Sequence, residues 1–225
     1  MHINLIYLAS GQGRRFGRNK LLTPFAGRPL YQHGFLQLAG AMKYVHEAGI
    51  SCDLAVVSPY ETLRQWCREQ GALAWPNDVS KEGIAASIRI GTAALDGDAY
   101  GFFVADRPLL QARTIARFLL GYVRSGQSVG AMRASGVVGN PAVFCSTFCQ
   151  ELMSLRGDRG AGALLKKYRE QCWLYDVPSI ELADIDTEAD ARYLLPLMNK
   201  KYNTYYIYVQ SMLTKTAYSI FFLSS

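Results

Sequence analysis

The sequence contains no uninterrupted apolar stretch of the roughly 18 residues that a membrane-spanning helix needs. Its first apolar run is not preceded by a charged segment or followed by a cleavage site, which predicts a strand and not a signal peptide. Basic residues form no long run and no patch interleaved with aromatic residues. We therefore expect a soluble protein with neither a membrane nor nucleic acid as its partner. The net charge of +6 then suits small polyanionic substrates.

Histidine and cysteine are also too sparse for several kinds of chemistry. The three histidines form no cluster, no pair of cysteines or histidines has the spacing of zinc ligands, and no G-x-S-x-G motif occurs. These absences exclude a zinc site and a nucleophilic triad as interpretations of the sequence. The five cysteines are odd in number and include no C-x-x-C pair, which predicts reduced, mostly buried thiols in a cytoplasmic protein.

The composition that remains is that of a globular protein. Half of the 225 residues are hydrophobic and 19% are charged, and a chain of this length buries roughly 70% of its unfolded surface. We expect one α/β domain over residues 1–199. Residues 200–225 change in composition, being rich in tyrosine and nearly uncharged, and we interpret them as an appendage.

A glycine-rich and arginine-rich segment, Leu8 to Leu22, is the main signal in the sequence. It follows a short apolar run, Ile3 to Leu8, that is typical of a strand buried on both faces. Its glycines allow the backbone N–H groups to turn toward an anion, and its cations can bind phosphate oxygens. These residues are Gly11, Gly13, Gly17, Arg14, Arg15, Arg18 and Lys20. The segment is therefore predicted to hold the phosphates of a nucleotide.

Two familiar phosphate motifs do not match this segment. The dinucleotide fingerprint G-x-G-x-x-G requires its third glycine one place earlier, and a helix directly after it. The Walker loop requires a G-K-[ST] ending, which is missing.

Strand and helix patterns alternate along the rest of the chain. Further strands are expected over residues 54–57, 72–75, 100–105, 128–132, 141–144 and 173–177. Helices are expected over residues 30–49, 61–70, 84–95, 114–124 and 147–155. A short helix is also expected to end at residue 168, and a last helix to begin after residue 186. Ser58 and Glu61 match a capping box, residues 134–140 a turn between strands, and Thr187 with Asp190 a helix cap. The alternation predicts a mostly parallel sheet with right-handed crossovers, whose ligands bind at the carboxyl ends of the strands.

Two acidic residues are the candidates for a metal site. Asp106 and Asp186 are each expected to follow an apolar strand, at the sheet edge where the glycine-rich segment also lies. Two carboxylates that converge on triphosphate oxygens suit Mg²⁺, which usually takes few protein ligands besides phosphate and water. Such a site favours attack by an anionic substrate on a metal-bound triphosphate, without a protein nucleophile.

Six motifs occur in the order seen in the MobA-like nucleotidyltransferases. Within that family, the chain most closely resembles the molybdenum cofactor cytidylyltransferases, and the resemblance covers residues 3–198. The motifs are Leu8-Ala-Ser-Gly-x-Gly-x-Arg-Phe-Gly-x-Asn-Lys-Leu-Leu22, Gly83-x-x-x-Ser87-x-x-x-Gly91, Asp106-x-Pro108, Gly139-x-Pro141-x-x-Phe144, Gly157-Asp-x-Gly-Ala161 and Asp184-Ile-Asp-Thr187. The resemblance implies a Rossmann-like three-layer α/β/α sandwich and Mg²⁺ dependence. It further implies transfer of CMP from CTP to the phosphate of molybdopterin, with release of pyrophosphate.

The resemblance also implies roles for particular residues. Nucleotide binding falls to Leu8, Ala9, Ser10, Gly11, Gly13, Arg15, Lys20 and Ser87, and catalysis to Arg15, Lys20 and Asp106. Metal binding falls to Asp106 and Asp186, and acceptor binding to Asn140, Pro141, Gly157, Asp158, Gly160 and Ala161. Relatives that transfer GMP usually have glycine at the position of Ser10, so its larger side chain favours CTP over GTP.

Departures from the family pattern leave other functions open. Arg107 stands where the family usually has a neutral residue, and Gly162 stands where an arginine is common. One alternative is a GTP-dependent or sugar-phosphate nucleotidyltransferase. Another is a non-catalytic carrier of the molybdenum cofactor that serves a molybdenum hydroxylase.

Overall fold

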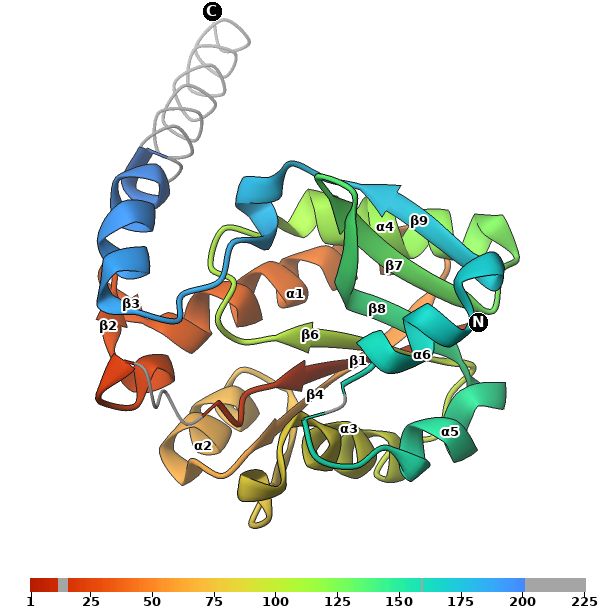
Figure 1. Ribbon diagram of the computed structural model, residues 1–225, viewed down its shortest axis with the longest axis horizontal. Helices are drawn as coiled ribbons and strands as arrows, with labels where there is room; N and C mark the ends of the chain where they lie inside the picture. Colours follow the sequence, from red (N-terminus) through yellow and green to blue (C-terminus); the bar gives the residue numbers. More distant parts are fainter. Residues whose placement is uncertain (12–15, 159, 201–225) are drawn as a thin grey trace, which may run out of the picture.

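The computed structural model describes residues 1–11, 16–158 and 160–200. A seven-stranded sheet forms its centre, in the order β5-β4-β1-β6-β8-β7-β9 (Figure 1). The strands are β1 (His2–Leu8), β4 (Ser51–Ser58), β5 (Leu73–Pro76), β6 (Ala99–Val104), β7 (Val129–Ala134), β8 (Val137–Cys145) and β9 (Cys172–Asp176). Two short strands, β2 (Pro24–Phe25) and β3 (Arg28–Pro29), form a separate antiparallel pair.

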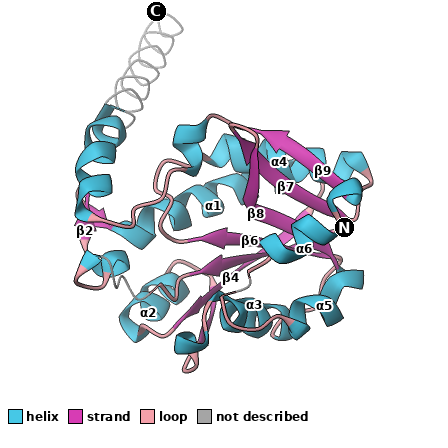
Figure 2. Ribbon diagram, viewed as in Figure 1, coloured by secondary structure: helices cyan, strands magenta, loops and turns pink. Residues whose placement is uncertain are grey.

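Helices cover both faces of this sheet, which confirms the three-layer α/β/α sandwich (Figure 2). The helices are α1 (Leu30–Glu47), α2 (Glu61–Glu69), α3 (Ile84–Ala93), α4 (Ala112–Ser125), α5 (Cys149–Ser154) and α6 (Gly162–Lys167), and residues 188–200 are helical as well. No helix in the described part of the chain is long and apolar enough to cross a membrane.

The two faces have separate hydrophobic cores because side chains alternate along each strand. In β1, Leu5 and Tyr7 pack with α1, α2 and α4, whereas Ile6 and Leu8 pack with α3, α5 and α6. All four side chains are at most 6% exposed. The prediction of a strand buried on both faces is therefore confirmed, and β1 lies at the centre of the sheet.

The sheet is parallel except for β8, which runs antiparallel to both of its neighbours. The turn expected over residues 134–140 is present but shorter than expected. The strands β7 and β8 continue almost to the tip of a hairpin whose two turn residues, Ser135 and Gly136, both have positive φ. Such a tight turn cannot make a crossover connection, so β8 must return antiparallel.

Two of the five thiols lie in the core, fewer than expected, and the other three are half-buried. Cys52 and Cys67 are buried, and burial raises the pKa of each thiol to about 12. The five cysteines are all free. The predicted appendage falls on residues 200–225, of which all but residue 200 lie outside the described residues.

Candidate active site

A cavity of about 490 Å³ opens at the carboxyl ends of β1 and β6, where the topology of a parallel sheet predicts a ligand. It is lined by Leu8, Ser10, Gly11, Lys20, Ser80, Lys81, Gly83, Ile84, Ser87, Val104, Asp106, Asp158 and Asp186. Most of the residues that we predicted for the nucleotide and the metal are thus brought together. Ala9 is fully buried beneath the cavity, and Gly13 and Arg15 lie outside the described residues.

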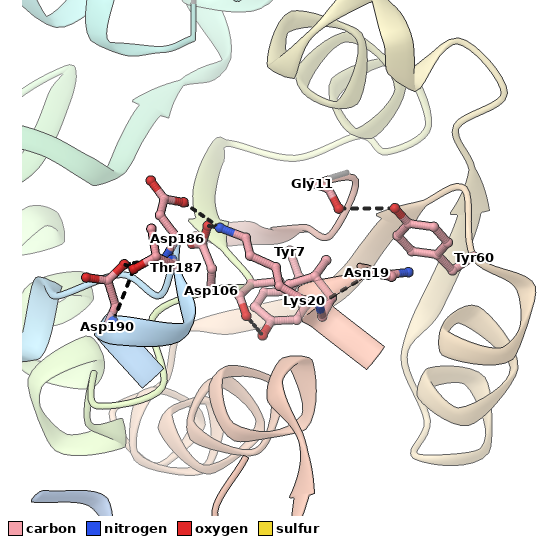
Figure 3. Close-up of polar contacts among 11 residues, drawn as sticks. Tyr7, Gly11, Asn19, Lys20, Tyr60, Asp106, Asp186, Thr187 and Asp190 are labelled. Carbon is pink, nitrogen blue, oxygen red and sulfur yellow. Dashed lines mark hydrogen bonds and ion pairs between the residues drawn. The ribbon is translucent and has the colours of Figure 1, made fainter. Parts of the chain in front are cut away.

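The ammonium group of Lys20 lies between the carboxylates of Asp106 and Asp186 (Figure 3). Its Nζ is 2.9 Å from Asp106 Oδ2 and 2.6 Å from Asp186 Oδ1, and the lysine side chain is only 7% exposed. Charge-assisted hydrogen bonds of this length hold all three groups in place.

Each of these three residues is positioned by its backbone. Lys20 begins a 3₁₀ turn that is capped by the Asn19 side chain, which accepts a hydrogen bond from the N–H of Leu21 at 3.2 Å. Asp106 lies two residues beyond the end of β6. Asp186 does not follow a strand directly, so that expectation was wrong: nine residues separate it from the end of β9. Its segment is attached to the residues that follow β6, because the Ile185 N–H donates to the Asp106 carbonyl at 3.0 Å.

The predicted cap after Asp186 is confirmed. Thr187 Oγ1 accepts from the N–H of Asp190, and the Asp190 carboxylate accepts from the N–H groups of Asp186 and Thr187. These bonds fix the backbone that carries the Asp186 carboxylate. Hydrogen bonds from Thr187 also lower the pKa of Asp190.

The protonation of Lys20 follows from its surroundings. Burial disfavours the charged form and lowers the pKa of its ammonium group, but the charge of Asp106 and the hydrogen bonds that the ammonium group donates to both carboxylates outweigh burial, so that the pKa is raised overall. Lys20 is therefore a cation at neutral pH.

The carboxylates of Asp106 and Asp186 also fit a divalent metal ion. Their oxygens converge on one point, as the shared ammonium group shows, and carboxylate oxygens are the ligands that Mg²⁺ and Mn²⁺ prefer. The described residues contain no group of three or more His, Cys, Asp or Glu side chains that could hold a metal. A metal at these two acids would thus take its other ligands from phosphate and water.

Side chains behind the cavity wall form a second polar cluster that the sequence did not reveal. Asn77, which is fully buried, donates to Ser10 Oγ at 3.1 Å and to Ser87 Oγ at 2.9 Å. The only sequence signal was a polar residue directly after β5, at the same sheet edge.

The first turn of the glycine-rich segment is held by α2 and the end of β4. Ser58 Oγ donates to the Ala9 carbonyl at 2.8 Å, and the Tyr60 hydroxyl donates to the Gly11 carbonyl at 3.1 Å. The capping box expected at Ser58 and Glu61 was wrong. Glu61 instead forms ion pairs with arginines of α2, and Tyr60 occupies the N-cap without a side-chain cap.

The segment from Gly157 to Ala161 docks on the start of α3. The Gly157 carbonyl accepts from the Ala85 N–H at 3.1 Å, and the adjacent Asp158 lines the cavity. Gly83 makes this approach possible, because its φ is +88° and a Cβ there would lie 2.4 Å from Asp158 Oδ1. Gly160 packs against Ile84, and Ala161 is buried in the core.

Among the six residues predicted for the acceptor, only Asp158 lines the cavity. Asn140 and Pro141 belong to β8, where the Asn140 carbonyl accepts a hydrogen bond from the guanidinium group of Arg107. Burial lowers the pKa of Arg107, although the charges of Asp106 and Asp184 act in the opposite direction. Arg107 thus places a cation near Asp106 and Asp184 and bonds it to β8.

A Rossmann-like sheet with a cavity at its carboxyl edge, a buried lysine and two convergent carboxylates defines a nucleotide-binding α/β protein. Comparison of the sequence with family models identifies the family: residues 5–172 match the MobA-like NTP transferase domain, and the chain belongs to this family. No curated protein gives a significant match.

Solved structures share the fold over almost their whole length. Rv0371c from Mycobacterium tuberculosis H37Rv, in complex with manganese, is 21% identical with a TM-score of 0.63, and the match covers 87% of this chain and 99% of that one. CMP:2-keto-3-deoxy-manno-octonic acid synthetase in complex with CTP is 14% identical with a TM-score of 0.65, covering 89% and 99%. Molybdopterin-guanine dinucleotide biosynthesis protein A from Archaeoglobus fulgidus is 14% identical with a TM-score of 0.61, covering 89% and 100%. At these identities the matches show a shared nucleotidyltransferase-type fold.

Proposed function

We propose that the protein is a divalent-metal-dependent cytidylyltransferase that moves CMP from CTP to the phosphate of a molybdopterin-type acceptor and releases pyrophosphate. The observation that carries this proposal is the convergence of Asp106, Asp186 and Lys20 on one point of the cavity. Membership of the MobA-like family supports nucleotidyl transfer. Ser10 in the cavity wall supports CTP, as does the CTP complex of a structural neighbour.

Asp106 and Asp186 would hold the metal ion, Mg²⁺ by preference, which when bound neutralises the charge of the triphosphate. The manganese complex of Rv0371c supports a divalent cation in this fold. The N–H groups at the start of the glycine-rich segment, together with Ser10 and Ser87, would position the nucleotide against the ends of β1 and α3.

In the reaction, a phosphate oxygen of the acceptor attacks the α-phosphorus of CTP. A bond forms between these two atoms while the bond from the α-phosphorus to the bridging oxygen of pyrophosphate breaks, and pyrophosphate leaves with the electron pair. Lys20, a cation that lines the cavity, would stabilise the charge that accumulates on the leaving group. Asp158, on the facing loop, orients the acceptor.

Pyrophosphate release provides the test. Purified protein is mixed with Mg²⁺ or Mn²⁺, with CTP or GTP, and with molybdopterin, and the product is identified by mass. We expect pyrophosphate and a CMP adduct with CTP. Absence of release with both nucleotides contradicts the proposal, and a product from a sugar phosphate, but none from molybdopterin, would reassign the acceptor.

The proposed setting is the cytoplasm, in keeping with the five free thiols, and the product would be used by a molybdenum hydroxylase.

A further inference from the structure

The hydroxyl groups of Ser10 and Ser87 both donate their hydrogen bonds to oxygen atoms of the protein. Ser87 Oγ donates to Ser10 Oγ at 3.0 Å, and Ser10 Oγ donates to the Val57 carbonyl at 3.2 Å. A hydroxyl group has a single hydrogen to donate. Neither side chain therefore has a hydrogen left for a ligand in the cavity that both of them line.

Asn77 imposes this arrangement from behind. Its amide nitrogen donates one hydrogen to Ser10 Oγ and the other to Ser87 Oγ. Ser10 Oγ thus accepts two hydrogen bonds and donates one, while Ser87 Oγ keeps one lone pair without a partner. At these two side chains, the cavity wall presents hydroxyl oxygen atoms that cannot donate, and of the two only Ser87 Oγ can still accept.

The orientation of the Asn77 amide follows from counting hydrogen bonds. As it stands, Asn77 Oδ1 is buried without a hydrogen-bond partner, and both amide hydrogens are used. If the amide were flipped, Asn77 Oδ1 would face the two serine hydroxyl groups, and the two hydrogens of the amide nitrogen would occupy the buried position where no hydrogen-bond partner is present. One unpaired acceptor costs less than two unpaired donors, so the arrangement with the nitrogen toward the serines is favoured.

The backbone of Asn77 is also fixed. Its N–H donates to the Ser58 carbonyl at 3.2 Å, and its own carbonyl accepts from the Ser80 N–H at 3.3 Å. The residue is fully buried, so its side chain cannot turn to solvent. The direction of the two hydroxyl groups is therefore set before a ligand binds.

We propose that Asn77 is a positioning residue for base selection: it directs the Ser10 and Ser87 hydroxyl groups so that the cavity favours a base with an exocyclic amino group over one with a carbonyl group at that place. This inference rests on the proposed function, since it requires that the cavity binds a pyrimidine nucleoside triphosphate. The amino group of cytosine can donate to the remaining lone pair of Ser87 Oγ. The corresponding carbonyl of uracil would face Ser10 Oγ and Ser87 Oγ without a donor.

The test compares CTP with UTP, because cytosine carries an amino group at the ring position where uracil carries a carbonyl group. Dissociation constants for both are measured by calorimetry with Mg²⁺ present, for the wild-type chain, Asn77→Ala and Ser87→Ala. We expect the wild type to bind CTP about 10- to 100-fold more tightly than UTP, the range expected for one unpaired buried polar group. Asn77→Ala frees the Ser87 hydroxyl to rotate and donate to uracil, so the preference should fall at least fivefold, mainly through tighter UTP binding.

The control variant is Asn4→Ala. Asn4 is another fully buried asparagine, at the opposite end of β1, where its amide donates to the Asp96 carbonyl at 3.1 Å. This variant should lose stability as Asn77→Ala does, and keep the CTP preference. A merely structural role for Asn77 would lower the affinity for both nucleotides equally and leave their ratio unchanged.

A double-mutant cycle separates the direct contact between Ser87 and the base from the positioning of Ser87 by Asn77. If Asn77 acts through Ser87, adding Asn77→Ala to Ser87→Ala should change the CTP-to-UTP ratio by less than twofold. Equal binding of CTP and UTP by the wild type, or an unchanged ratio in both single variants, overturns the inference while pyrophosphate release can still support the proposed function. Binding of neither nucleotide overturns both.

Discussion

Lys20 is the residue whose removal should be felt most at the active site. In a Lys20→Met variant, the carboxylates of Asp106 and Asp186 lose the ammonium group to which they are bonded at 2.9 and 2.6 Å. Two like unit charges about 5 Å apart repel each other by about 3 kcal/mol at an effective dielectric constant of about 20. Because Asp106 is 22% and Asp186 45% exposed, solvent screens part of this repulsion. We expect a loss of about 2 kcal/mol in the free energy of unfolding.

Urea unfolding at pH 7 measures this loss, with Lys43→Met as the matched control. Lys43 is exposed on α1, so the same substitution there should cost less than about 0.5 kcal/mol. Since the folded-state pKa of Lys20 is raised, its contribution is fully present below the unfolded value of about 10.4 and is lost as the pH rises through the folded value. The difference between wild type and Lys20→Met should therefore stay constant from neutral pH to about pH 10 and then shrink. Equal stabilities at pH 7, or a difference that grows above pH 10, would refute this reasoning.

Three further substitutions probe the metal site, the facing loop and the last helix. Asp106→Asn should abolish pyrophosphate release while CTP binding measured by calorimetry largely survives; unchanged turnover would remove Asp106 from the mechanism. Gly83→Ala should cost about 2 kcal/mol in urea unfolding, because φ is +88° and the new Cβ would lie 2.4 Å from a carboxylate oxygen of the facing loop. Gly162→Ala, with nothing within 4 Å of its Cβ, is the control, and equal costs would contradict the argument. Thr187→Ala removes the helix cap and should cost about 1 kcal/mol at pH 7. Since the folded pKa of Asp190 is lowered, this cost should diminish as the pH falls through that value, and a cost independent of pH would count against the cap.

Most of the secondary structure could be predicted from local patterns. The apolar run before the glycine-rich segment is β1, and the periodic segment after Pro29 is α1, ending two residues before Gly49. The local patterns made wrong predictions where a side chain had a stronger hydrogen-bond partner in a distant part of the chain. Ser58 matched a capping box, but its hydroxyl donates to the Ala9 carbonyl, a bond between strands that no local pattern contains.

The acidic residues show the same limit in the candidate site. Asp106 was placed correctly because it lies only two residues beyond the end of a strand. Asp186 was chosen for a strand that it does not follow, and it reaches the cavity only because the segment at Ile185 bonds to the end of β6. Asn77 escaped notice because its partners, Ser10 and Ser87, are distant in the sequence.

The sequence by itself determined the fold class and the edge of the sheet where the site lies, because alternating strand and helix patterns and a glycine-rich segment after a strand are local properties of the chain. Only the tertiary structure decided which charges meet. It placed the Lys20 ammonium group between two carboxylates that lie 86 and 166 residues further along the chain. It also buried an asparagine behind two serines, where hydrogen-bond partners are limited to those that the fold supplies.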